Sequence, residues 1–227
     1  MLAEALFCLK EAPFRRESWP AVREQAAILS RFRRHQAAWE PHLAASRSVI
    51  LEAIQHCSMR DRAVILGSGL LLDVPIEELC RQFAQVVLVD LHHPAPARRM
   101  GRRHSNIDLL TTDIGAKDFW QNLVPMPDLL VSLNLAGQLA LMTDGDDRVL
   151  SHLDGLRNAT GTRVLITETM RLEHDEKGRE IAREQALPEA CGLEPPHNNW
   201  KWPLAPVGEL APYRGLLLDV GAWIWSA

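Results

Sequence analysis

The amino-acid sequence predicts an α/β fold, with a doubly wound, mostly parallel sheet, a C-terminal antiparallel hairpin and an N-terminal helical extension. From residue 62 onward, short apolar runs alternate with amphipathic segments, which is typical of parallel strands covered by helices on both faces. The first 60 residues instead carry apolar side chains at helical spacing. The last two apolar runs leave no room for a crossover helix, so they should pair antiparallel.

The N-terminal extension should form two or three helices packed ahead of the sheet. Val22, Ala26 and Leu29 recur at helical spacing. Pro20 and Pro41 suit helix starts or boundaries better than helix interiors. The arginines between these positions are expected to form a solvated face.

The period of the apolar residues also places the elements of the α/β part. We expect parallel strands at residues 62–66, 86–89, 106–111, 128–133 and 163–167. We expect helices at residues 75–83, 96–103, 135–142 and 146–158. Residues 200–206 and 213–225 should form the terminal hairpin.

The composition is ordinary for a globular protein. The chain has 227 residues, is 47% apolar and 24% charged, and carries a net charge of −4. We expect a helical extension in residues 1–60 and one α/β domain in residues 61–227. The charge gives no reason to expect nucleic acid or an anionic membrane as a partner. Four scattered cysteines, no signal peptide and no long apolar run indicate a cytoplasmic protein.

The turn after the first strand indicates a bound ligand. Gly67 and Gly69 flank Ser68 between a strand and a helix, and glycine lets the backbone pass close to a bound group. Asp90 ends the second strand, where its carboxylate can accept hydrogen bonds from ribose hydroxyls. A tight turn with nothing bound is the alternative. Ligands of such sheets lie at the carboxyl ends of the strands, so we favour a nucleotide-like ligand.

The alternation of strands and helices that ends in a hairpin, the glycine turn and the acidic strand tip together resemble the class I S-adenosylmethionine-dependent methyltransferases, over roughly residues 60–227. In that family the last strand of a terminal hairpin inserts antiparallel into the sheet. The resemblance implies S-adenosylmethionine as cofactor and methyl transfer as activity. The segment Ser132–Ala136 lacks the Asn-Pro-Pro-aromatic signature of enzymes that methylate amino groups on nucleic acid or glutamine. We therefore expect a small-molecule acceptor.

The resemblance also implies which residues hold the cofactor. In the family the glycine turn approaches the methionyl part, Asp90 would hold the ribose, and Asp113 would accept from the adenine amino group. The positions that match the family's motifs are Gly67, Ser68, Gly69, Asp90, Leu91, Asp113, Ile114 and Asn134. The family often has a third glycine in the turn, and here Leu71 takes its place. This departure lets the loop run less close to the ligand.

Methyl transfer requires that the nucleophile and the methyl group be aligned, and in some reactions that a proton be removed. The candidates for taking this proton are Glu168 at the end of the fifth strand, His174 in a polar loop, and His197 before the hairpin. A plain surface position is the alternative for each histidine. Trp200 and Trp202 share one strand face, which should be core, with one indole at its edge available to stack on a substrate.

Other polar residues have structural explanations. Asp73 is expected to cap the following helix. His92 and His93 come just after Asp90, but adjacent residues of an extended chain point in opposite directions, so we expect no metal site. Glu209, in the hairpin turn, is expected to be a solvated acid.

Two other functions are compatible with the same residues. A glycine turn and an acidic strand tip also serve nicotinamide-dependent Rossmann oxidoreductases, although the missing third glycine and the terminal hairpin argue against this function. A methyltransferase-like domain could instead be a non-catalytic binding or scaffold protein, with the first 60 residues as its partner surface.

Overall fold

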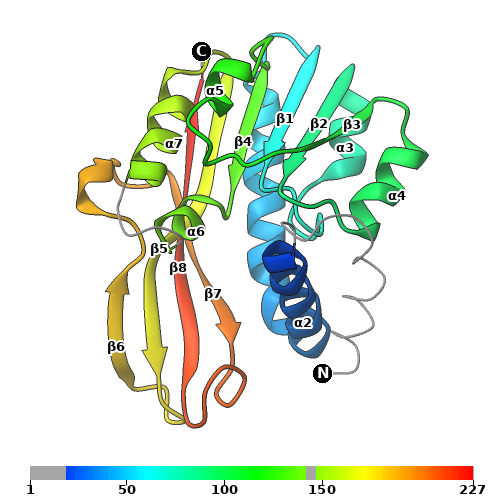
Figure 1. The fold of residues 1–227 in the computed structure, drawn as a ribbon. Coiled ribbons are helices and arrows are strands. Elements are labelled where there is room, and N and C mark those ends of the chain that lie inside the picture. Colours follow the sequence, from blue (N-terminus) through cyan, green and yellow to red (C-terminus); the bar gives the residue numbers. More distant parts are fainter. Residues whose placement is uncertain (1–18, 142–146, 227) are drawn as a thin grey trace.

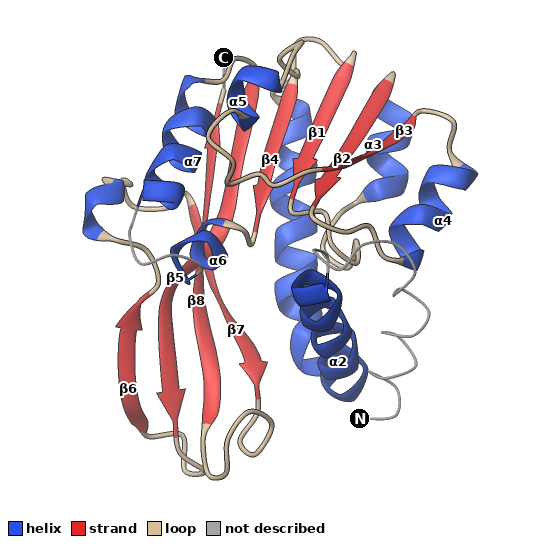
Figure 2. Cartoon of the chain, in the orientation of Figure 1, coloured by secondary structure: helices blue, strands red, loops and turns tan. Residues whose placement is uncertain are grey.

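The structure is a computed structural model that describes residues 19–141 and 147–226. Helices cover both faces of an eight-stranded sheet (Figures 1 and 2). The strands are β1 (Arg62–Leu66), β2 (Gln85–Asp90), β3 (Ile107–Thr111), β4 (Leu129–Leu133), β5 (Thr162–His174), β6 (Glu180–Gln185), β7 (Asn198–Ala205) and β8 (Gly215–Trp225). The helices are α2 (Trp19–Gln55), α3 (Ile76–Gln82), α4 (Ala95–Arg103), α5 (Phe119–Asn122), α6 (Ala136–Leu141), α7 (Asp147–Asn158) and the short 3₁₀ helix η2 (Glu189–Cys191).

The strand order confirms the predicted fold class. The order is β3-β2-β1-β4-β5-β8-β7, and β6 pairs with β5 outside this path. Strands β1 to β5 are parallel to their neighbours within this group. Strand β8 lies between β5 and β7 and is antiparallel to both, as the hairpin prediction requires.

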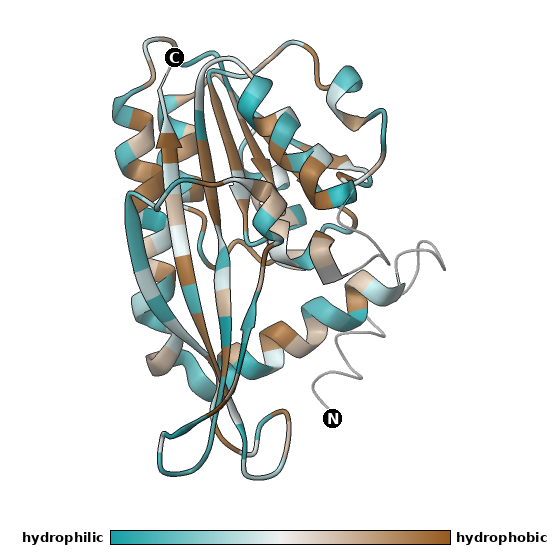
Figure 3. Ribbon diagram, turned by 90° about the vertical axis from the view of Figure 1, so that its left-hand side faces the viewer, coloured by the Kyte–Doolittle hydropathy of each residue, from teal (hydrophilic) through white to brown (hydrophobic). Residues whose placement is uncertain are grey.

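Two hydrophobic layers hold the sheet, one on each face. In β1, Ala63 and Ile65 join the layer that contains residues of α2 and α3. Val64 and Leu66 join the opposite layer, which contains residues of α5, α6 and α7. Successive side chains of a strand point to opposite faces, so a strand covered on both sides is apolar along its whole length. The parallel strands are accordingly mostly brown in Figure 3.

Helix α2 has two straight parts joined at His35, whose backbone is non-helical (φ −126°, ψ 29°). The expectation that Pro41 marks a helix boundary is wrong, because Pro41 lies inside the second part. That part packs on the parallel sheet through Ile50 and Ile54. The first part runs beside the lower ends of β7 and β8 (Figure 1). No helix in the described segments is long and apolar enough to cross a bilayer.

The far end of β5 differs from the prediction. The strand continues to His174, so the polar loop expected at residues 173–175 is wrong. Strand β6 was not predicted, because all six of its residues are exposed and its sequence has no apolar alternation. Both features depend on partners distant in sequence, since β5 pairs with β8 on one side and with β6 on the other. The result is a sheet extension beyond the parallel core.

Candidate functional site

A cavity of about 620 Å³ opens at the carboxyl ends of the parallel strands. The strand order places it there: β1 lies between β2 and β4, so the chain runs away from β1 in both directions and leaves a crevice at this edge. The turn after β1 and the tips of β2, β4 and β5 line the inner part. Helix α2 and strands β7 and β8 line the outer part.

The glycine turn closes against the neighbouring strand tips. Gly67 has φ +77°, and its N–H donates to the carbonyl of Val89 at 3.0 Å. A Cβ at this position would lie 2.7 Å from the carbonyl oxygen of Leu133, which is closer than real Cβ atoms come. Glycine is therefore required here both by the backbone angle and by the approach of β4.

Leu71 takes a glycine-like backbone conformation. Its φ is +61°, and its N–H donates to the carbonyl of Ser68 at 3.0 Å. The left-handed conformation costs a non-glycine residue about 1–2 kcal/mol. The side chain packs against the hydrophobic layer that holds α2 and α3, and it is not part of the cavity lining. The missing third glycine thus leaves the cavity clear.

Asp90 links the second strand to the glycine turn. Its Oδ2 accepts the Gly69 N–H at 2.7 Å, and its Oδ1 faces the His92 N–H at 3.4 Å. Burial raises the pKa of Asp90, while these backbone donors act in the opposite direction. An ionised carboxylate has about four acceptor sites, so Asp90 keeps acceptor capacity for a diol.

A second carboxylate lies beside the turn. Asp73 accepts a hydrogen bond from Asn134 Nδ2 at 2.8 Å and lines the cavity. Burial raises the pKa of Asp73 to about 6. The expectation that Asp73 caps α3 is wrong, because the cap position is Pro75 and no side chain caps the helix. Its cavity position depends on β4, which lies far away in the sequence.

The tip of β3 carries the third predicted polar contact. Asp113 lines the cavity and pairs with Arg148 Nη2, and its Oδ1 accepts the Gly115 N–H at 2.9 Å. Ile114 is buried beside it, and Leu91, 39% exposed, lines the same region after β2. The predicted cofactor positions thus all border one cavity.

No family model and no curated protein matches the chain. Among solved structures, the chain is similar to the Burkholderia thailandensis 1,6-didemethyltoxoflavin-N1-methyltransferase, with 15% identity over 93% of this chain and 92% of that chain and a TM-score of 0.51. It also matches the N-methyltransferase NodS from Bradyrhizobium japonicum WM9, with 15% identity over 77% of this chain and 84% of that chain and a TM-score of 0.45.

The first match extends over nearly the whole of both chains, and β8 is inserted antiparallel between β5 and β7. The fold is that of the class I S-adenosylmethionine-dependent methyltransferases. In the remaining description we refer to it as the methyltransferase fold.

Glu168 borders the cavity of this methyltransferase fold at the tip of β5. It is 9% exposed, and its Oε1 pairs with Arg171 Nη2 at 3.0 Å. A Cβ on Gly137 would lie 2.3 Å from the carboxyl carbon of Glu168, so α6 leaves room for this side chain.

The two predicted histidines lie outside the cavity lining. His174 ends β5, six positions beyond Glu168, and its ring packs against Gly215. His197 Nδ1 accepts the Ile224 N–H at 3.2 Å. This contact lies at the opposite edge of the sheet, because Ile224 pairs with Val164 near the start of β5. Neither histidine meets the group of strand-tip residues.

Sequence reasoning did not identify which residues of α2 reach the cavity. Gln25 Nε2 donates to the carbonyl of His92 at 2.9 Å, which fixes α2 against the loop after β2. Glu24, the preceding residue, and Arg31, on a later turn, also line the cavity. The helical period predicts α2, but which of its faces meets the strand tips depends on packing.

Several buried polar atoms at the cavity lack a protein partner. Among the described residues, Ser68 Oγ, Asn134 Oδ1 and Gln25 Oε1 make no hydrogen bond, and all three residues line the cavity. Buried polar groups are nearly always satisfied, so these atoms fit a polar ligand such as the cofactor of the methyltransferase fold. In the described part of the chain, no three His, Cys, Asp or Glu side chains form a metal site.

Proposed function

We propose that the protein transfers a methyl group from S-adenosylmethionine to a small-molecule acceptor. The observation that carries this proposal is the continuous cavity, which joins the glycine turn and the acidic strand tips to a second space beside α2. Bound cofactor supplies an activated methyl group, so the protein's task is to align the acceptor and exclude water.

The inner part of the cavity would hold the cofactor. The turn at Gly67 and Gly69 would approach the methionyl part, Asp90 would hold the ribose, and Asp113 would accept from the adenine amino group. Asn134 and Asp73, hydrogen-bonded to each other, add polar atoms next to the turn.

The outer part of the cavity would hold the acceptor. It lies between the first part of α2 and the strands β7 and β8, so the acceptor must fit between a helix and a sheet. An enclosed site of this kind suits a small molecule rather than a nucleic acid. We propose that the reaction takes place in the cytoplasm, in keeping with scattered cysteines that form no CxxC pair.

Calorimetry with S-adenosylmethionine and S-adenosylhomocysteine tests the proposal. We expect both to bind the folded protein at sub-millimolar concentration. We expect no binding of the reduced nicotinamide cofactor in a fluorescence titration. The assignment would be overturned if neither S-adenosyl ligand bound, or if the nicotinamide cofactor showed saturable binding instead. If Asp90→Ala retained full cofactor affinity, Asp90 would not be the ribose contact.

A further inference from the structure

The outer part of the cavity has apolar walls on two sides. Helix α2 contributes one wall, and the hairpin strands contribute the other. The apolar side chains that line this part are Ile28, Leu43, Leu204, Leu216 and Leu218. Burial of apolar surface is the main source of binding energy in such a site, so an acceptor bound here must itself be largely apolar.

Trp202, held by the buried rings of Trp39 and His42, gives this part a flat and rigid boundary. Trp202 stacks on His42 with ring centroids 3.8 Å apart and parallel planes, and Trp39 meets Trp202 edge-on at 5.0 Å. Trp200 Nε1 donates to His42 Nδ1 at 2.9 Å, and Trp39 Nε1 donates to the carbonyl of Leu204 at 3.3 Å. Both Trp39 and Trp202 line the cavity. Fixed aromatic rings favour planar ligands, which stack without losing internal freedom.

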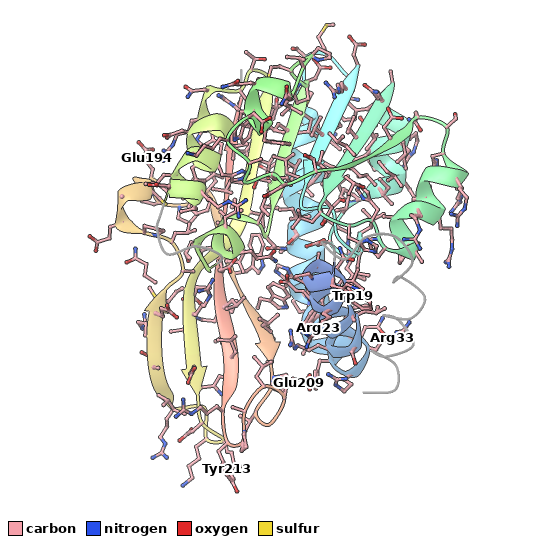
Figure 4. All side chains as sticks on the ribbon, viewed as in Figure 1. Trp19, Arg23, Arg33, Glu194, Glu209 and Tyr213 are labelled. Carbon is pink, nitrogen blue, oxygen red and sulfur yellow. The ribbon has the colours of Figure 1, made fainter. Side chains whose placement is uncertain are left out.

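The charges at the two ends of the outer part are already paired. At the inner end, Glu168 pairs with Arg171. At the outer end, Arg31 lines the cavity and its Nε lies 3.8 Å from Oε1 of Glu209 in the β7–β8 turn, which also pairs with Arg34 and with His35 at the α2 kink. Figure 4 shows Glu209 close to α2. An acceptor carrying a full charge would have to compete with these pairs, so the site suits a neutral acceptor.

Glu24 and Glu184 are the exceptions: both line the cavity, and neither side chain makes a hydrogen bond or ion pair with the described residues. Glu184 belongs to β6, whose residues are all exposed, whereas Glu24 belongs to α2. The Gln25–His92 hydrogen bond holds this turn of α2 beside the loop that follows Asp90. Although the side chain is reached by solvent, partial burial raises the pKa of Glu24, and the charges of Asp90 and Glu168 raise it further, while Arg31 lowers it. A carboxylate so placed is a good proton acceptor.

We propose that the acceptor is a neutral, planar and largely apolar ring compound whose reacting group is an O–H or N–H, and that Glu24 takes the proton of that group. This inference rests on the proposed function. The lone pair of the acceptor oxygen or nitrogen forms the new bond to the methyl carbon, and the carbon–sulfur bonding pair goes to sulfur. The proton of the reacting group goes to the Glu24 carboxylate and then to solvent, so charge and atoms balance.

The first test measures binding to the full chain saturated with S-adenosylhomocysteine. The probes are 7-hydroxycoumarin and 7-methoxycoumarin, which differ by the O–H, followed by fluorescence. We expect both to bind, and Glu24→Gln to weaken only the hydroxyl probe, by about 10–150-fold, as expected for one hydrogen bond to a charged group. Glu52→Gln, an exposed glutamate on the same helix, is the matched control and should change neither probe.

The second test measures S-adenosylhomocysteine formation with a panel of hydroxylated and N–H ring compounds against glycine, ethanolamine and spermidine. We expect turnover only within the ring compounds. Glu24→Gln should lower kcat about 10²-fold or more, with cofactor affinity unchanged, and Glu24→Asp should restore part of it.

The outcomes distinguish a failure of the proposed function from a failure of the inference about the acceptor and Glu24. Failure to bind S-adenosylhomocysteine defeats the proposed function itself. Cofactor binding without binding of any ring compound, turnover of the amines alone, or an equal effect of Glu24→Gln on both coumarins overturns the inference and leaves the proposed function standing.

Discussion

The Gly67→Ala substitution probes the closest contact in the glycine turn. Gly67 has φ +77°, and an added Cβ would lie 2.7 Å from the carbonyl oxygen of Leu133. The opposing atom belongs to the backbone of β4, so it cannot turn aside as a flexible side chain would. Either the turn or the β4 tip must move by several tenths of an ångström, and both border the cavity.

Two effects contribute to the expected loss of stability. The left-handed backbone costs alanine about 1–2 kcal/mol, and forcing an extra methyl group into a closely packed site costs about 1–3 kcal/mol more. Together we expect a loss of about 2–5 kcal/mol in the free energy of unfolding. For a chain of this length that corresponds to a fall in Tm of about 4–20 °C.

Gly178→Ala is the matched control, because Gly178 has φ +74° with no atom within 4 Å of the added Cβ. It should show the backbone cost alone. Urea unfolding and thermal melting of both variants, with calorimetry for S-adenosylhomocysteine, give the comparison. We expect Gly67→Ala also to weaken ligand binding by about tenfold or more, since a shift of the turn removes a backbone contact of about 1.4 kcal/mol. Equal losses of stability in the two variants, or unchanged binding by Gly67→Ala, would refute the reasoning.

Three further predictions follow from contacts in the same region. Glu209→Gln should lower the free energy of unfolding by about 1–3 kcal/mol at neutral pH. The hydrogen bond from Arg34 lowers the pKa of Glu209 to about 2, so this stability is present above about pH 4.5 and is lost toward pH 2. Urea unfolding across that range should show the difference in unfolding free energy between wild type and variant shrinking as the pH falls. A difference that stays constant would contradict the prediction. Asp90→Asn should raise the Kd for S-adenosylhomocysteine about 10–100-fold by calorimetry, whereas the exposed Asp108→Asn should leave it unchanged. Trp39→Ala should cost about 3–5 kcal/mol in urea unfolding, because Trp39 is 1% exposed, and a loss below about 1 kcal/mol would show that α2 is not held by this ring.

Local patterns were sufficient for the parallel core. The short apolar runs predicted β1 to β4 and the start of β5 nearly at their observed bounds, because a strand buried on both faces must be apolar throughout. The hairpin followed from the short connection between β7 and β8. The glycine turn and Asp90 were recognisable because glycine and a strand-end carboxylate are each required by local geometry.

The predictions failed where distant partners decide the structure. His174 looked like a loop residue because its strand is stabilised by β6 and β8, which come later in the chain. Glu209 looked like a solvated turn residue, yet Arg34 and His35 of α2 pair with it across the fold. Asp73 looked like a helix cap, although Asn134 at the tip of β4 binds it.

The sequence by itself determined the fold class and most of the residues at the inner end of the cavity. These features depend on the period of apolar residues and on backbone requirements that act within a few positions of the chain. Only the tertiary structure decided which residues form the outer end of the cavity. The kink at His35, the aromatic contact between α2 and β7 and the place of Glu24 at the cavity arise from packing between distant segments; His42 and Trp202, for example, lie 160 positions apart. No local pattern specifies which helix face meets which strand, so the acceptor side of the site became visible only in the folded chain.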